Sequence, residues 1–222
     1  HLKRLCLCLR FGEVPLEMFE SLSHAIQLQE LDLQMHRLGL IPPRERAQIL
    51  SRLVVGDGGH GVVARLLQNP QSQLQHLILR NVGLHDRHFI AFAQLLPKSK
   101  LKSLDVSCNN IQHGGILALA RQLPKIQSLQ RIILVPNPWS TLINNNVYSA
   151  RAEKCLEALA QGMMQNYSVE ELQIYFLGSL QRRPVLKFHP QIMLLVDCMN
   201  MNKAGRRIVA PDTMVPLGLW PF

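Results

Sequence analysis

Aromatic residues are scarce in this sequence, and it contains no CxxC pair. Aromatic side chains make up 5% of the 222 residues, and the cysteines form an odd set of five. An odd set without metal-ligand spacing argues against both a disulfide framework and a structural zinc site. The closest pair, Cys6 and Cys8, falls on the polar face of a predicted strand, so we expect it to bind no metal. This cysteine usage favours a reducing, intracellular compartment, either cytoplasmic or nuclear.

The sequence also lacks an apolar run that is long enough to cross a membrane. Residues 132–150 carry no charge, but Pro136, Pro138 and the asparagine run at 144–146 exclude a membrane helix there. No secretory signal is recognisable. Because the chain opens inside a strand pattern and without an initiator methionine, we expect it to be part of a longer protein.

A catalytic constellation is a third absence. No Ser or Cys nucleophile stands beside a His and an acid, and no metal ligands are paired. Gly56, Gly58 and Gly61 match G-x-G-x-x-G, but the segment before them reads as helix, and no acid ends the next strand. We therefore interpret residues 56–61 as a mobile loop that binds no nucleotide, and we expect neither enzyme activity nor a cofactor.

What the sequence does contain is a repeated pattern of apolar residues. The clearest copy covers residues 101–123, where Leu101, Leu104 and Val106 give the spacing L-x-x-L-x-L and Asn109 follows at a turn. The alternation predicts a strand with one apolar face, and the apolar stripe after the turn predicts an amphipathic helix. Such a unit cannot bury both of its apolar faces alone, so it requires stacked copies.

The pattern recurs at seven places along the chain. Most of the steps from one copy to the next are about 27 residues long, which accommodates one strand and one full helix. The second and the fifth step are clearly longer and predict insertions near residues 34–73 and 135–148. The copies begin at Leu2, Leu28, Leu74, Leu101, Leu129, Val169 and Val196.

The two insertions and the C-terminal end depart from the repeat. The first insertion favours two helices, with an extra short strand at 50–55 as the alternative. The second is rich in Pro and Asn and predicts a loop, in which Trp139 is either a clamp on the array or an exposed contact. Residues 203–222 are irregular and are predicted to cover the apolar edge of the last repeat.

The step length and the order strand–Asn–Gly–helix resemble the ribonuclease-inhibitor-like class of leucine-rich repeat proteins over nearly the whole chain. Residues 202–207 and the Pro- and Trp-containing tail resemble the ending of diatom-type repeat proteins. The resemblance implies one array over residues 1–222 with about seven repeats. It implies an α/β right-handed solenoid, shaped as a horseshoe with a concave parallel sheet and convex helices. In the third repeat Val82 holds the usual Asn place, one residue after Asn81.

Seven parallel strands are predicted, at residues 4–8, 30–34, 76–80, 103–107, 131–135, 171–175 and 198–202. Their solvent-facing positions alternate in charge and include apolar residues, which suits a protein partner. A nucleic-acid groove would instead concentrate positive charge and aromatic residues. The excess of 24 Lys and Arg over 15 Asp and Glu falls on predicted helices and loops. The residues that we expect to contact a partner are Asp32, Ile78, Arg80, Asp105, Arg131, Ile133, Glu171 and Tyr175.

The pattern therefore predicts a non-catalytic scaffold that binds a protein through the concave face. Two alternatives stay open. If a loop arginine of this chain reached the nucleotide bound by a small GTPase, the chain would be a regulator of that GTPase. The net charge of +9 keeps nucleic-acid association as the other alternative. We expect no membrane association, and neither the partner's identity nor the oligomeric state follows from the sequence.

Overall fold

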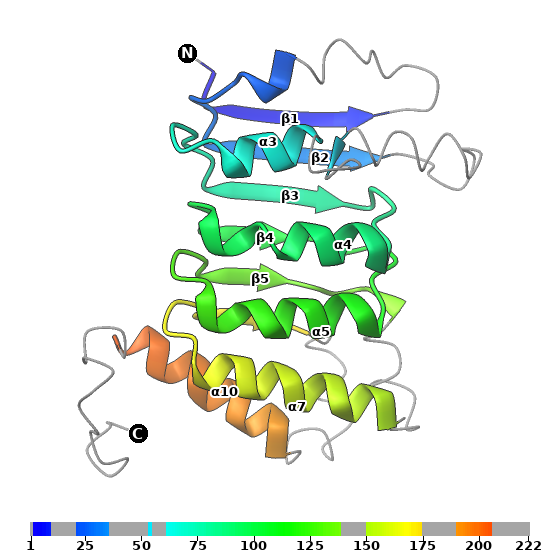
Figure 1. Ribbon diagram of the computed structural model, residues 1–222, viewed down its shortest axis with the longest axis vertical. Helices are drawn as coiled ribbons and strands as arrows, with labels where there is room; N and C mark the ends of the chain where they lie inside the picture. The colour runs from blue at the N-terminus through cyan, green and yellow to red at the C-terminus, as the bar shows by residue number, and fades with distance from the viewer. Residues whose placement is uncertain are drawn as a thin grey trace.

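The computed structural model describes residues 2–9, 21–35, 53–54, 61–138, 150–174 and 190–205. These residues form one six-stranded parallel sheet in the order β1-β2-β3-β4-β5-β6, and helices cover one of its faces (Figure 1). Every strand pairs with the strand before it in the sequence, so the units stack in one direction. This arrangement is the predicted α/β leucine-rich repeat solenoid.

The six strands begin where the sequence predicts them, and β4, β5 and β6 end two residues earlier than predicted. One apolar residue from each of β2 to β6 forms a buried column, with Leu31, Leu77, Leu104, Ile132 and Leu172 paired in register. Each of the five is at most 6% exposed, because alternate residues of a strand point to the same side. The strands are β1 (Arg4–Leu9), β2 (Glu30–Met35), β3 (His76–Arg80), β4 (Ser103–Asp105), β5 (Arg131–Ile133) and β6 (Glu171–Gln173).

The helices bury the apolar stripes that the sequence predicts. In the third repeat Phe89 and Phe92 stack with their ring centroids 5.9 Å apart. Pro97 and Pro124 open short 3-10 turns that end the helices before them. The described helices are α3 (Val62–Gln68), α4 (Asp86–Ala93), α5 (His113–Gln122), α7 (Ala150–Met164) and α10 (Pro190–Lys203), with the 3-10 turns η2 (Leu96–Lys98) and η3 (Leu123–Lys125).

Asparagine side chains join the turns of neighbouring repeats, and Asn109 is the clearest case. Its Oδ1 accepts hydrogen bonds from the backbone N–H groups of Val82 and Leu84, at 3.1 and 3.0 Å. In the third repeat the position of this asparagine is taken by Val82, and the turn is stabilised by a different residue. Asn81 adopts a left-handed backbone with φ 54°, and its amide donates to the Met35 carbonyl at 2.9 Å. Asparagine tolerates this backbone region better than most residues do.

The predicted seventh strand at 198–202 is wrong, because these residues belong to helix α10. Ile192, Leu195, Cys198 and Asn202 are buried at helical spacing, so they share one face of the helix. Cys198 and Asn202 therefore do not belong to the solvent-facing row. Helix α10 packs against α7, and Met199 Sδ accepts a 3.0 Å hydrogen bond from the backbone N–H of Leu172 in β6. Among the described residues, β6 is therefore followed by a helix rather than by another strand.

The insertions are described in part. Helix α3 confirms the second of the two helices predicted in the first insertion, while the alternative strand and Gly56 and Gly58 lie largely outside the described residues. The prediction that residues 56–61 bind no nucleotide therefore stays a prediction. Trp139, the loop around it and the tail at 206–222 also lie outside the described residues.

Candidate protein interface

The sheet face opposite the helices, here called the open face, presents its side chains in rows. Because the strands are in register, equivalent residues of neighbouring strands lie side by side. The first row is Arg4, Glu30, His76, Ser103, Arg131 and Glu171. The middle row is Cys6, Asp32, Ile78, Asp105, Ile133 and Gln173.

The charged residues of the open face form ion pairs between adjacent strands. Arg4 Nε lies 3.2 Å from Glu30 Oε2, and Arg131 Nε lies 3.0 Å from Glu171 Oε2. Exposed pairs of this kind contribute little to stability, yet they neutralise the surface that carries them. Together with the pair between Arg80 and Asp105, they cancel three positive charges against three negative ones.

Asp32 is the remaining carboxylate of these rows. It accepts hydrogen bonds from Gln34 Nε2 at 3.1 Å and from Cys6 Sγ at 3.5 Å. The hydrogen bond to Asp32 and the negative charge of that carboxylate raise the pKa of the Cys6 thiol. The open face is therefore close to neutral and slightly acidic, which does not match the electrostatics of a nucleic-acid groove.

Arg80 is held in place by a buried carboxylate on the next strand. Its Nη2 lies 2.6 Å from Asp105 Oδ2, and its Nε donates to Ser107 Oγ at 3.1 Å. Asp105 Oδ1 in turn accepts the backbone N–H of Ser107 at 2.9 Å. The hydrogen bond and the charge of Asp105 raise the pKa of Arg80, so the guanidinium stays charged. The Arg80 side chain is still 46% exposed, which leaves it available to a partner.

In the middle row, one isoleucine lies on each side of Asp105, the carboxylate that holds Arg80. Ile78 and Ile133 are the register partners of Asp105 on its two sides, and both are half-buried. Val135, two residues after Ile133, is buried at 8% exposure. The centre of the open face thus combines a fixed arginine with partly exposed apolar side chains, the composition found at the centre of many protein interfaces.

The structure brings together seven of the eight predicted contact residues. Asp32, Ile78, Arg80, Asp105, Arg131, Ile133 and Glu171 all belong to the open face, whereas Tyr175 lies outside the described residues.

One of these seven is less accessible than its place on the open face suggests. Asp105 is 4% exposed beneath Arg80, whose Nη2 lies 2.6 Å from its Oδ2. Sequence reasoning also missed the supporting role of Ser107, which lies one repeat step after Arg80 and next to it in space.

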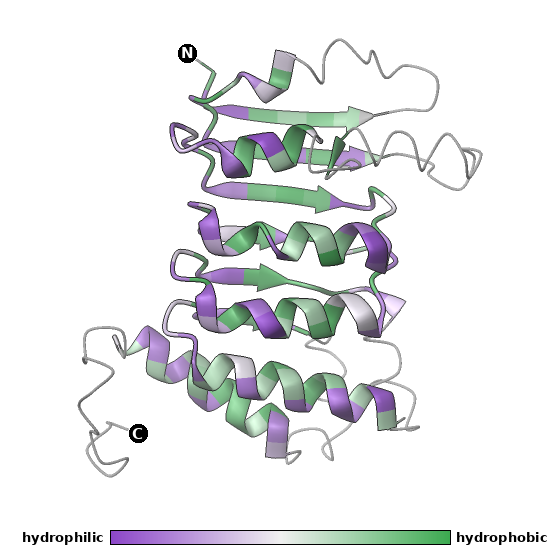
Figure 2. Cartoon of the chain, in the orientation of Figure 1, coloured by the Kyte–Doolittle hydropathy of each residue, from purple (hydrophilic) through white to green (hydrophobic). Residues whose placement is uncertain are grey.

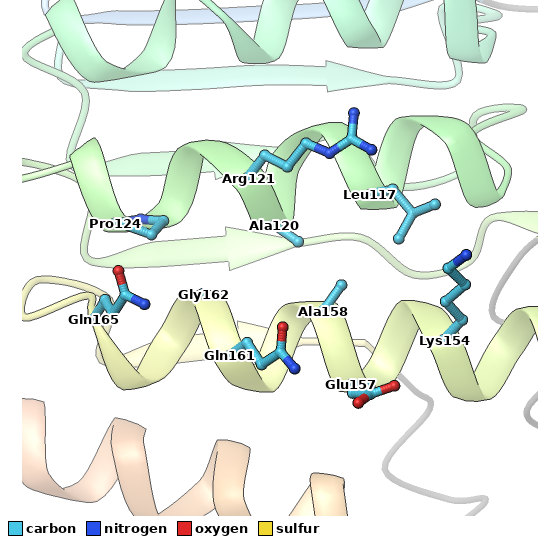
Figure 3. A pocket seen from close by; sticks show the side chains of 10 residues that line it. All are labelled: Leu117, Ala120, Arg121, Pro124, Lys154, Glu157, Ala158, Gln161, Gly162 and Gln165. Atoms are coloured by element: carbon cyan, nitrogen blue, oxygen red, sulfur yellow. The ribbon is translucent and has the colours of Figure 1, made fainter.

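A groove runs between α5 and α7 on the outer side of the array (Figure 3). One hollow of about 530 Å³ is lined by Ala120, Gly162 and Glu157, among others. A second hollow of about 400 Å³ near the start of α5 shares Leu117 and Lys154 with the first. The lining mixes charges of both signs, so the groove has no clear preference for an anion or a cation.

The start of α5 is already capped by the preceding repeat. Asp86 Oδ1 accepts the backbone N–H of Gln112 at 2.6 Å. Gly114 leaves room for that carboxylate, since a Cβ there would lie 2.7 Å from Asp86 Oδ2. Asp86 therefore satisfies one N–H group at this helix end, and its carboxylate occupies the place that an anion would take. In the described part of the chain, no group of three or more His, Cys, Asp or Glu is placed to hold a metal ion, and no helix is long and apolar enough to span a membrane.

The comparisons with known proteins agree with this fold. No protein-family model matches the sequence, and a search of curated proteins finds no match. A solved structure named "Leiomodin-1 Actin-Binding Site 2 (ABS2)" superposes with a TM-score of 0.59 at 18% identity, covering 86% of this chain and 91% of that one. The C-terminal domain of a Caenorhabditis elegans tropomodulin gives a TM-score of 0.56 at 14% identity, covering 88% and 97%. At these identities the likeness establishes the leucine-rich repeat fold and does not extend to a shared partner.

Proposed function

We propose that this chain is a non-catalytic scaffold that binds a protein partner through the open face. The observation that carries the proposal is Arg80, a half-exposed cation fixed by the buried carboxylate of Asp105, which itself lies between Ile78 and Ile133 in the middle row. Fixing an arginine before binding lowers the conformational entropy that is lost when it meets a partner. Apolar side chains around it exclude water and strengthen its hydrogen bonds.

Actin is the first partner to test. One structural neighbour is named as an actin-binding site, and the superposition covers 91% of that chain. The ribonuclease-inhibitor-like assignment is supported by the usual step of about 27 residues between repeats. An intracellular location is supported by the cysteines, because all five lie in the described residues and none forms a disulfide.

The experiment compares two isoleucine-to-aspartate variants in binding to purified actin, measured by biolayer interferometry. Ile133→Asp places a charge in the centre of the open face and is expected to abolish binding. Ile90→Asp makes the same change on α4, where Ile90 is 36% exposed on the helix side, and is expected to leave binding unchanged. Far-UV circular dichroism checks that both variants are folded.

Arg80→Lys refines the same test. The lysine keeps the positive charge but loses the planar fork that joins Asp105 and Ser107. Binding is expected to weaken by about tenfold, the typical effect of losing one well-placed charged hydrogen bond. If folded Ile133→Asp and Arg80→Lys proteins both bind as the wild type does, the open face is not the binding surface.

A further inference from the structure

Positive charge gathers at the edge of the array where the strands begin. We call this surface the basic edge, formed by Lys98, Lys100, Lys102, Arg121 and Lys125, all of which are exposed. Lys98 and Lys125 end the equivalent 3-10 turns η2 and η3, and Lys102 directly precedes β4. Figure 2 shows hydrophilic residues along this edge, at the ends of α4 and α5 and at the strand starts.

Acidic residues do not compensate the basic edge. Residues 95–130 contain a single carboxylate, Asp105, which is buried on the open face and bound to Arg80. In the part of the chain that the structure describes, no carboxylate forms an ion pair with any of the five cations. Lys100 Nζ donates to the Pro70 carbonyl oxygen at 2.6 Å, which fixes its position without neutralising it.

The helix dipoles explain only part of this charge. The carbonyl ends of α4 and α5 point to this edge and favour cations in the last turn, where Arg121 lies. Lys100 and Lys102 lie beyond the helix ends, in the extended chain that leads into β4. Like charges closer than the Debye length of about 8 Å repel one another, so an opposite charge from outside would relieve the repulsion.

The surroundings of the basic edge select the class of partner. Residues 95–130 contain no Phe, Tyr or Trp, so the segment that carries the five cations has no aromatic side chain of its own for stacking on nucleic-acid bases. The large exposed apolar residues of the described chain are Leu2, Ile90, Met164, Tyr167 and Met193, and none of them falls within 95–130. Met164 and Tyr167 lie near η3, since Asn166 donates to the Leu123 and Ile126 carbonyls, but two such side chains do not form the apolar helix face that inserts into a lipid surface.

We propose that the basic edge is a second docking surface, which binds an acidic segment of a protein partner. Equivalent strands in the sheet are about 4.8 Å apart, so lysines on successive repeats follow one another along the edge. An extended acidic segment that crosses the repeats would meet Lys98 on one repeat and Lys102 and Lys125 on the next. This surface shares no residue with the open face, so the proposal stands apart from the proposed function.

The test measures binding of a fluorescein-labelled peptide of alternating glutamate and alanine by fluorescence anisotropy. The triple variant Lys98→Glu/Lys102→Glu/Lys125→Glu is expected to weaken binding by tenfold or more. A matched control, Arg87→Glu/Arg151→Glu/Lys154→Glu, changes the net charge equally at the other end of the helices, where α4 and α7 begin. It is expected to keep binding within about twofold of the wild type, because exposed charges beyond a Debye length are screened.

Several results would overturn the proposal. It fails if the wild type does not bind the peptide, or if both triple variants lose binding equally, since the peptide would then sense only net charge. It also fails if oligo(dT) or phosphatidylserine vesicles bind the wild type more tightly than the peptide and the basic-edge variant loses that binding. If the charge reversal unfolds the chain, Lys98→Gln/Lys102→Gln/Lys125→Gln replaces it. Ile133→Asp, which changes the open face, is expected to bind the peptide normally.

Discussion

Asn137 and Asn109 occupy the same turn position in successive repeats, and each bonds the backbone of the repeat before it. Asn137 Oδ1 accepts the backbone N–H of Ile111 at 3.0 Å, and its Nδ2 donates to the Val106 carbonyl at 3.0 Å. Asn109 makes the corresponding bonds to Val82, Leu84 and the Leu79 carbonyl. These two side chains therefore close backbone hydrogen bonds that the strand ladder leaves open at its end.

Removing the Asn137 side chain is expected to destabilise the array strongly. Asn137 is 3% exposed, and Asn137→Ala removes the side-chain bonds to the Ile111 N–H group and to the Leu134 carbonyl. We expect a loss of about 2–4 kcal/mol in the free energy of unfolding, measured by urea denaturation. The exposed Gln127→Ala is the control and is expected to change stability by less than about 0.5 kcal/mol. Similar unfolding midpoints for the two variants would contradict a structural role for the asparagine bonds.

Truncating the leucine at the centre of the buried column is expected to destabilise the protein. Leu104 is fully buried between Leu77 and Ile132 on the two adjacent strands. Leu104→Ala removes its contacts and leaves a cavity, at an expected cost of about 2–5 kcal/mol. The measurement is again urea denaturation, and a loss well below about 1 kcal/mol would be incompatible with the register described above.

Gly162 sets how closely α7 approaches the preceding repeat. A Cβ at this position would lie 2.5 Å from the Ala120 carbonyl oxygen and 3.2 Å from Leu123 Cβ. Alanine normally stabilises a helix by about 1 kcal/mol over glycine, so the sign of the effect tests the packing. We expect Gly162→Ala to destabilise the protein by about 1–3 kcal/mol because it separates α5 from α7. The exposed neighbour Gln161→Ala provides the comparison. An increase in stability for Gly162→Ala would show that a methyl group fits between α5 and α7.

The buried thiol of Cys155 makes stability depend on alkaline pH. Burial, with a smaller contribution from the charge of Asp86, raises its pKa from 9.0 to about 11. Between these two values the unfolded chain releases the thiol proton and the folded chain keeps it. The free energy of unfolding is therefore expected to fall as pH rises from 9 to 11. Thermal unfolding at several pH values tests this, and the part of the fall that comes from Cys155 should be missing in Cys155→Ala.

The buried position of Cys155 also predicts that alkylation will spare this thiol. At pH 8 iodoacetamide should modify the exposed Cys108 while leaving Cys155 intact in the folded protein, because only an accessible thiolate reacts. Mass spectrometry after digestion measures the two fractions. Equal modification of Cys155 and Cys108 would contradict the buried position of α7's inner face.

The sequence allowed most of the strands to be placed, because L-x-x-L-x-L alternation and a regular repeat step leave little freedom of register. The exception at 198–202 has a physical reason. Residues 192–201 are almost continuously apolar, so Val196, Met199 and Met201 fit a strand pattern although the buried residues follow a helical period. The alternation alone does not distinguish a seventh strand at 198–202 from the helix that lies beside β6.

The open face shows a second limit of sequence reasoning. Alternation correctly places Asp105 on the solvent side of its strand, yet the longer side chain of Arg80 on the neighbouring strand covers it. Which exposed positions are shielded depends on contacts between repeats, and these follow from the register rather than from either repeat alone. The ion pairs of Arg4 with Glu30 and of Arg131 with Glu171 arise in the same way.

The strict neighbour-to-neighbour order of the strands has a mechanical consequence. Among the six described strands, none is inserted between two others that precede it in the chain, so a tension applied to the two ends of the sheet meets its strand interfaces in series. Such a molecule should extend stepwise, releasing one repeat of chain at a time, and the remaining repeats should stay folded while this happens. A partner held across several strands would clamp these interfaces together and would raise the force needed for each step.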